Sequence, residues 1–163
     1  MNNPIYLLTF VAALGSGLVA GIFFAFSNLV MKALARVPPA QGISAMQSIN
    51  VVVLNRWFFA VFFGTAACCL ILTITSFIRW QKPSAGYLLV GSLLYLIGTI
   101  LVTIACNVPL NDALAAVDPS SADAGPVWSN YVKNWIGWNH VRAIASFAAA
   151  ASFTVALSHS GYR

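Results

Sequence analysis

Four long apolar runs divide this chain, and their length restricts the folds that it can adopt. A helix needs about 20 residues to cross the hydrocarbon core of a bilayer, and each run reaches about that length. Only 7% of the residues are charged, whereas soluble domains carry about 25%. The sequence therefore predicts an all-α integral membrane protein, an antiparallel four-helix bundle that forms a single transmembrane domain over residues 1–163. The expected spans are residues 5–31, 57–78, 87–106 and 135–158.

The connections between these runs are marked by prolines. Pro38-Pro39 breaks the first helix, because proline lacks a backbone donor and restrains the residue before it. Residues 40–54 then predict an additional short helix between the first two spans. Pro109 is expected to stop the third helix, and Gly125-Pro126 to start the fourth. The first run is too long for the apolar region of a signal peptide, so we expect it to be retained as a span.

The segment Trp135–Arg142 combines tryptophans, an amide, an imidazole and a guanidinium directly before the apolar residues 143–157. Side chains three and four apart share one face of a helix. His140 falls to the side of the resulting stripe. An ionisable group at this depth marks a functional site, or it is an interfacial anchor whose charge reaches the headgroups. The stripe consists of Trp128, Tyr131, Trp135, Trp138, Asn139 and Arg142.

Polar residues concentrate on one side of the predicted bundle. With four spans, the connections after the first and third helices lie on the same side of the membrane. Any single amide at a helix end could be a cap, but amides and arginines come from the end of every span on that side, which favours a polar pocket. The residues concerned are Ser27, Asn28, Gln47, Asn50, Asn55, Arg56, Asn107, Asn111, Trp135, Trp138, Asn139, His140 and Arg142.

The residue types limit the chemistry of such a pocket. Asparagine and glutamine suit a carbonyl or phenol ligand, arginine stabilises an anion, and tryptophan offers flat walls. The scarcity of carboxylates disfavours hydrolysis by paired acids. The chain has no glutamate, which a di-iron bundle requires. Cys68, Cys69 and Cys106 lie in apolar runs without a Cys-x-x-Cys spacing, so they suggest neither a disulfide framework nor a metal site.

Three motifs in order resemble the anthrone oxygenase-like family of small four-helix membrane proteins. They are Ala45-Met46-Gln47-Ser48-Ile49-Asn50, Asn107-Val108-Pro109-Leu110-Asn111 and Trp135-x-x-Trp138-Asn139-x-x-Arg142, and Gly17-x-x-x-Gly21-x-Phe23-Phe24 is similar as well. Characterised members are fungal enzymes of polyketide pathways that oxidise an anthrone to an anthraquinone, and most members have no assigned substrate. The resemblance covers nearly the whole chain. It carries over to Gln47, Asn50, Asn107, Pro109, Asn111, Trp135, Trp138, Asn139 and Arg142.

The leading functional hypothesis is a cofactor-independent oxygenase of a lipid-soluble phenol or anthrone-like ring. The alternatives are a non-enzymatic protein that binds a quinone, haem or lipid headgroup, and a purely structural subunit. No cofactor and no metal is expected, with haem bound through His140 as the alternative. The expected catalytic residues are Arg142, Asn139 and His140. The expected substrate-binding residues are Gln47, Asn50, Asn55, Asn107, Asn111, Trp135 and Trp138.

The expected partners follow from the surface of the predicted bundle. These are the lipid bilayer and an apolar small molecule, and no basic cluster suggests nucleic acid. A ridge of small residues allows close approach of helices in lipid and a possible homo-oligomer. The basic residues Arg79, Lys82 and Arg163 favour termini in the cytoplasm, with the protein in the cell (inner) membrane. The ridge consists of Ala13, Gly17, Gly21 and Ala25.

Overall fold

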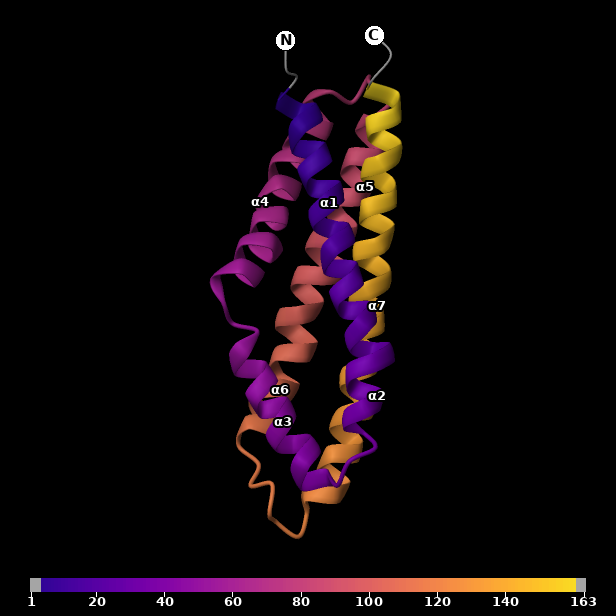
Figure 1. The fold of residues 1–163 in the computed structure, drawn as a ribbon. Coiled ribbons are helices and arrows are strands. Elements are labelled where there is room, and N and C mark those ends of the chain that lie inside the picture. The colour runs from indigo at the N-terminus through magenta and orange to yellow at the C-terminus, as the bar shows by residue number, and fades with distance from the viewer. Residues whose placement is uncertain (1–3, 161–163) are drawn as a thin grey trace.

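The computed structural model describes residues 4–160, and over that range it contains helices and no strand. Four helical segments are long and apolar enough to cross a membrane, and they run antiparallel in one elongated bundle (Figure 1). This confirms the predicted class, a membrane four-helix bundle with an additional short helix after the first span. The four segments are Pro4–Leu34, Arg56–Ile78, Ala85–Ala115 and Ala124–His159.

Two of the long segments contain wide, π-helical turns. The first consists of α1 (Pro4–Ala25), η1 (Phe26–Val30) and α2 (Met31–Leu34). The short helix α3 (Pro39–Val52) and the second span, α4 (Arg56–Ile78), follow it. The third segment consists of α5 (Ala85–Tyr95), η2 (Leu96–Leu101), η3 (Thr103–Asn107) and α6 (Val108–Ala115). The fourth is the single helix α7 (Ala124–Ser160).

The bundle has two different ends. The two chain ends and the connection between α4 and α5 lie together at the top of Figure 1, and we call this the termini end. The elements α2, α3 and α6 and the connection to α7 lie at the opposite end, which we call the α3 end. The sequence predicted this division, because alternate connections of an antiparallel bundle share a side.

Pro109 does not stop the third helix, contrary to the prediction. The helix continues through it to Ala115, and Pro109 occupies the first turn of α6. The reason is the π-helical turn of η3 directly before it, where the backbone N–H of Val108 donates to the carbonyl of Thr103, five residues back. A proline clashes with a carbonyl in the regular α-helical ladder. A π-bulge displaces that ladder locally and accommodates the ring.

The first and fourth helices are also longer than the predicted spans. The first continues beyond Met31 to Leu34. The fourth begins at Ala124, next to the expected start at Gly125-Pro126, and runs for 37 residues. The segment Trp135–Arg142 therefore lies inside one continuous helix, as the expected start at Gly125-Pro126 implied.

Small residues bring the helices into direct contact toward the termini end. The most extensive packing joins α1 and α7, where both helices bury alanines and serines. A Cβ atom on Gly91 would lie 2.8 Å from the Phe153 ring, and one on Gly98 would overlap Ala145. Because real Cβ atoms do not approach that closely, these glycines are required for the observed spacing of α5–η2 and α7.

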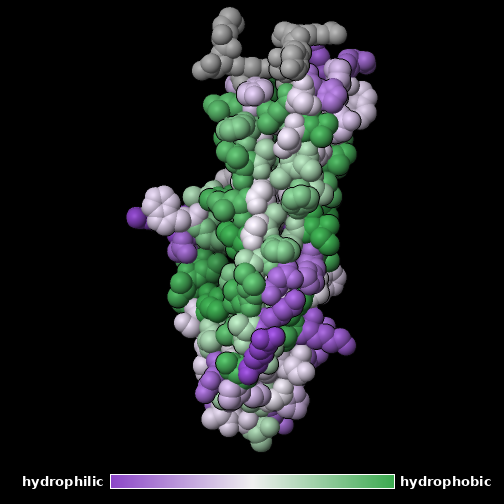
Figure 2. All heavy atoms as spheres, turned by 45° about the vertical axis from the view of Figure 1, so that its right-hand side comes forward, coloured by the Kyte–Doolittle hydropathy of each residue, from purple (hydrophilic) through white to green (hydrophobic). Residues whose placement is uncertain are grey.

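The predicted small-residue ridge of α1 faces outward. Gly17 and Gly21 are exposed, and a Cβ atom on Gly21 would meet no atom within 4 Å. Figure 2 shows one face of the molecule, which is mainly apolar over its upper part and has hydrophilic residues gathered over its lower part. Gly21 is therefore open to its surroundings, whereas Ala13 packs against the buried core and a Cβ atom on Gly17 would lie 4.0 Å from Ala150 of α7.

The connection between α6 and α7 is ordered by side-chain hydrogen bonds. Gln47 on α3 donates from Nε2 to the carbonyls of Leu114 (2.9 Å) and Val117 (3.0 Å). The carboxylate of Asp118 accepts from the hydroxyl of Ser120 at 2.7 Å and from its backbone N–H at 2.9 Å. These two bonds hold the pKa of Asp118 below its usual range. Gln47 therefore fastens α3 to the loop.

Candidate functional site

The candidate site is organised around Arg142, whose side chain is buried inside the bundle. Only 5% of this residue is exposed. Its Nη2 donates to Oδ1 of Asn139 at 2.6 Å, and its Nη1 donates to Oγ1 of Thr103 at 3.3 Å. The guanidinium carbon lies 4.1 Å from the centroid of the Phe23 ring and 5.2 Å from that of Trp135. A charge at this depth is thus held by neutral hydrogen-bond acceptors and two aromatic faces.

Asn139 fixes the position of this arginine. It lies one turn before Arg142 on α7 and is fully buried. Its Nδ2 donates to the carbonyl of Phe23 and to Oγ of Ser27, both at 2.6 Å, while its Oδ1 accepts from Arg142. All of its hydrogen-bonding atoms are used within the protein. We therefore regard Asn139 as the residue that connects Arg142 to the first helix and orients its guanidinium.

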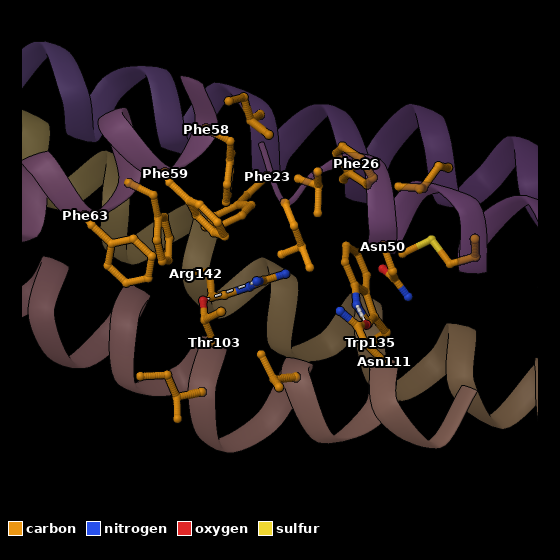
Figure 3. Close-up of a pocket in the computed structure, with 18 residues that line it drawn as sticks. Phe23, Phe26, Asn50, Phe58, Phe59, Phe63, Thr103, Asn111, Trp135 and Arg142 are labelled. Atoms are coloured by element: carbon orange, nitrogen blue, oxygen red, sulfur yellow. Dashed lines mark hydrogen bonds between the residues drawn. The ribbon is translucent and has the colours of Figure 1, made fainter. Parts of the chain in front are cut away.

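A cavity of about 300 Å³ lies beside Arg142. Its wall is built from η1 and the end of α1, from α3 and the start of α4, from η3 and α6, and from α7. Most of the wall is apolar, and Figure 3 shows Phe58, Phe59 and Phe63 of α4 on one side of Arg142 and Asn50, Asn111 and Trp135, together with Phe26, on the other. The wall residues with aromatic rings are Phe23, Phe26, Phe58, Phe59, Phe62, Phe63 and Trp135.

The polar part of the wall contains hydrogen-bonding atoms without partners. Asn111 accepts at Oδ1 from the hydroxyl of Tyr131 and from Nε1 of Trp135, both at 2.9 Å. Nδ2 of Asn50 and Nε of Arg142 are buried and have no hydrogen-bond partner. Buried polar atoms in native proteins normally find a partner. Of the six buried side-chain atoms that have no partner among the described residues, these two belong to residues that line the cavity.

The structure brings four of the predicted site residues to the cavity: Asn50, Asn111, Trp135 and Arg142. Two others support the wall from behind. Asn139 orients Arg142, and Asn107 donates to the carbonyl of Trp135 at 3.3 Å. Four of the expected site residues therefore line this mostly apolar cavity, and their role in binding a ligand stays a prediction.

The other four predicted site residues do not line the cavity. Gln47 fastens α3 to the loop after α6. Asn55 caps α4, because its Oδ1 accepts hydrogen bonds from the backbone N–H groups of Trp57 and Phe58, at 3.1 Å each. Trp138 is 43% exposed, because it lies beside the buried stripe and not on it. His140 is exposed in a shallow outer groove with Asn28 and Gly21.

The phenylalanines of α4 and Thr103 were not among the predicted site residues. A phenylalanine in an apolar span is as compatible with lipid as with a cavity, so composition alone does not distinguish them. One signal was present: Phe58, Phe59, Phe62 and Phe63 recur at helical spacing in the first turns of the span. Thr103 carries no such signal, because its place beside Arg142 depends on the π-helical turns.

Potential metal ligands do not cluster in the part of the chain that the structure describes. No group of three or more His, Cys, Asp or Glu side chains lies close enough to hold an ion within residues 4–160. Neither His140 nor His159 belongs to the cavity wall. A haem ligated by His140 would therefore lie on the outer face of α7 and not in the cavity.

Comparison with known proteins connects this site to one family. Residues 56–152 match the sequence model of a family described as anthrone oxygenase. The match covers more than half of the chain and includes α4, the π-helical turns of the third span and the part of α7 that carries Asn139 and Arg142. No curated protein and no solved structure shows a significant match.

Proposed function

Because the chain belongs to the anthrone oxygenase family, we propose that it is a membrane-embedded oxygenase of a lipid-soluble phenol or anthrone-like aromatic compound. The observation that carries this proposal is Arg142, which is buried beside an apolar cavity with only neutral hydrogen-bond partners. Burying a charge without a counterion is costly. An anionic ligand that forms in the cavity would supply the missing negative charge.

The cavity suits a small, flat molecule. Its volume of about 300 Å³ is at the lower end of the range of roughly 300–1,000 Å³ that is typical of small-molecule sites. Aromatic rings in the wall provide flat contact surfaces, and the polar atoms lie on one side. A fused aromatic ring system with an oxygen at its polar edge matches this distribution.

The proposed reaction oxidises a ring CH₂ group to a ketone with one molecule of O₂. Loss of one proton gives an anion whose charge is delocalised between that ring carbon and the carbonyl oxygen bonded to the ring. This anion gives one electron to O₂, and the resulting pair combines to form a carbon–oxygen bond, which becomes a hydroperoxide when the proton returns. The hydroperoxide then loses water. One oxygen atom stays in the ketone, and the other leaves in water with both hydrogens of the CH₂ group.

The residues of the cavity have distinct roles in this scheme. Arg142 stabilises the negative charge on the oxygen bonded to the ring, and Asn139 keeps the guanidinium in position. Trp135 and Phe23 hold the ring plane, while Asn50 and Asn111 bind further oxygen atoms of the substrate. A preorganised donor of this kind is typically worth about 2.7–4 kcal/mol. Because the anion itself reduces O₂, the scheme requires no further cofactor.

Oxygen uptake tests this function. The purified protein in liposomes is supplied with anthrone, and the O₂ consumed and the anthraquinone formed are followed together, after subtraction of oxidation in protein-free liposomes. We expect one O₂ per ketone and a strongly reduced rate for Arg142→Met. Uptake no faster than in protein-free liposomes would contradict the proposal. A Soret absorption band in the purified protein would favour haem binding instead.

The exposed charges also bear on orientation. The prediction of cytoplasmic termini assumed that Arg56 lies in the pocket, whereas Arg56 is exposed and its guanidinium carbon lies 5.0 Å from the centroid of the Trp57 ring. Arg56 is therefore added to Lys32, Arg36 and Lys133 in the number of basic residues at the α3 end. This set outweighs Arg79 and Lys82 at the termini end, while Arg163 lies outside the described residues.

Lys and Arg near the ends of spans favour the cytoplasmic side. We therefore propose a cytoplasmic α3 end in place of the predicted orientation, in the cell (inner) membrane. A reporter fused after Arg163 should be active in the periplasm, and one that is active only in the cytoplasm would contradict this orientation.

A further inference from the structure

The wall of the cavity beside Arg142 contains a group of strongly exposed residues. Five wall residues are partly exposed, with 39–63% of their surface accessible. They come from the connection before α4, from the first turns of α4, and from η3 and the start of α6. All five are apolar, and they form what we call the side opening. The residues are Leu54, Phe59, Phe63, Ile104 and Val108.

The other residues of the cavity wall are less exposed, eight of them half-buried and five buried. Phe23, Phe62, Met46 and Trp135 are each at most 5% exposed. Met46 belongs to a buried cluster that also contains Met31 and Leu114 and joins α2, α3, α6 and α7 at the α3 end. This cluster lies between the cavity and the α3 end, so the side opening is the most exposed apolar part of the cavity wall.

The depth of the side opening follows from α4. Its 23 residues rise about 34 Å at 1.5 Å per residue, close to the hydrocarbon thickness of about 30 Å. Arg56 and Trp57 at its start are the pair that normally marks a membrane interface. Phe59 and Phe63 lie one and two turns further along the helix, within about 10 Å of Arg56. The opening therefore faces acyl chains just inside the interface and not water.

The opening exists because the chain breaks between α3 and α4. The helix ends at Val52, and Asn55 starts a new one by capping α4. Figure 1 shows that the two helices meet at an angle there and that the start of α4 leans away from α6. On the opposite side of the opening, the π-helical turn of η3 carries Ile104. An uninterrupted helix on either side would follow a different path past the cavity.

We propose that the ligand of this cavity enters and leaves sideways, directly from the bilayer, through the opening between α4 and η3–α6. Phe59, Phe63 and Ile104 set its width. The ligand class is a flat aromatic molecule dissolved at the acyl-chain boundary, whose oxygen-bearing edge meets Arg142 after the ring system has passed the phenylalanines. The identity of the ligand rests on the proposed function, but the route does not.

Cysteine labelling tests the route without any substrate. In a chain whose three native cysteines are replaced by alanine, Met46→Cys places a thiol in the cavity wall. We expect this thiol to react with lipid-soluble N-phenylmaleimide in liposomes and to resist a sulfonated, membrane-impermeant analogue applied on both sides of the membrane. Ile104→Trp should slow the reaction with N-phenylmaleimide at least fivefold, and Ile104→Ala should accelerate it.

A matched control is Phe77→Trp, which enlarges another lipid-facing side chain of α4 far from the cavity and should change the rate less than twofold. Equal labelling by the sulfonated reagent would show a route from water and overturn the proposal. So would an unchanged rate in both Ile104 variants. Normal labelling without oxygen uptake would instead leave the route intact and reject the proposed oxygenase function.

Discussion

The four helices pack differently in the half of the bundle toward the termini end and in the half toward the α3 end. Toward the termini end, glycines let helices touch, as at Gly91 against Phe153 and Gly98 against Ala145. Toward the α3 end, Gly42 also lets α3 approach Trp128 closely, but around Arg142 aromatic rings and the arginine itself separate the helices. The elements α3 and α6 cover this space from the end. Contact leaves no room for a ligand, whereas separation creates the cavity.

This difference indicates which half of the bundle contributes most to its stability and which half contains the candidate site. Lipid is as apolar as a buried leucine, so helices associate in it mainly by close packing. The half with glycine contacts supplies that packing. Both halves contain buried polar atoms without a partner, at Ser16 and Ser92 in the half with glycine contacts and at Asn50 and Arg142 in the other. Only Asn50 and Arg142 line the cavity, where a ligand that pairs with them would offset their cost in free energy. The comparison predicts that mutations in the two halves affect different measurements.

The largest expected effect is on activity at Arg142. Arg142→Met should reduce kcat by about 100–1,000-fold, the usual loss when a preorganised donor is removed. Folded yield should be retained, because replacing a buried charge by an apolar residue of similar volume is often neutral or stabilising. Arg142→Lys should be nearly as inactive, because lysine lacks the planar fork of donors. Oxygen uptake at matched protein amounts measures both variants, and wild-type rates in Arg142→Lys would contradict the assigned role.

In the half toward the termini end, the corresponding mutation should affect stability and not activity. Gly98→Leu should lower the free energy of unfolding by about 1–3 kcal/mol, the typical cost of overpacking, because its side chain collides with Ala145. Gly64→Leu is the control, since a Cβ atom there meets nothing within 4 Å. Thermal unfolding in detergent compares the two variants. Equal melting temperatures would show that close contact is not what stabilises this half.

Asn139 lies where the two halves meet, and its loss should affect both measurements. Asn139→Ala leaves the carbonyl of Phe23, the hydroxyl of Ser27 and Nη2 of Arg142 without their partner. Each unsatisfied buried group costs about 1–3 kcal/mol. We expect weaker ligand binding together with a lower melting temperature. If only binding changes, Asn139 contacts the ligand itself and does not act by positioning Arg142.

The smallest effect is expected at His140. This residue is exposed on the other side of α7 from the cavity, so His140→Ala should change oxygen uptake less than twofold, within the range of roughly ±0.5 kcal/mol that is usual at surface sites. Should His140→Ala abolish activity while Arg142→Lys retains it, the site is built around the imidazole, and general-base or haem chemistry would replace the present account.

Much of this arrangement follows from periodicity in the sequence. Run lengths gave the four spans, and spacing along the last helix placed Trp135, Asn139 and Arg142 on one buried stripe. Trp138 was assigned to the same stripe, but a spacing of three or four residues does not separate the centre of a buried face from its margin. The amides at helix ends were ambiguous for a physical reason, because Asn55 as a cap and Asn50 in a cavity wall have the same local sequence signals.

The remaining differences arise from irregular backbone. Pro109 normally ends a helix, and only the π-helical turn before it allows the third span to continue. That turn also helps to place Thr103 and Ile104 beside the cavity, so both residues were missed together. Likewise, the phenylalanines of α4 became recognisable as cavity residues only once the break before Asn55 fixed where α4 begins and how far it diverges from α6.

The central claim is that Arg142 stabilises an anion in the cavity. The most direct measurement is the absorption spectrum of a hydroxyanthraquinone bound to the protein in liposomes, titrated with pH, because the phenol and its anion absorb at different wavelengths. We predict that the bound compound ionises at a lower pH in the wild type than in protein-free liposomes, and that Arg142→Met abolishes this difference. Ionisation at the same pH in the wild type, the variant and protein-free liposomes would contradict the account.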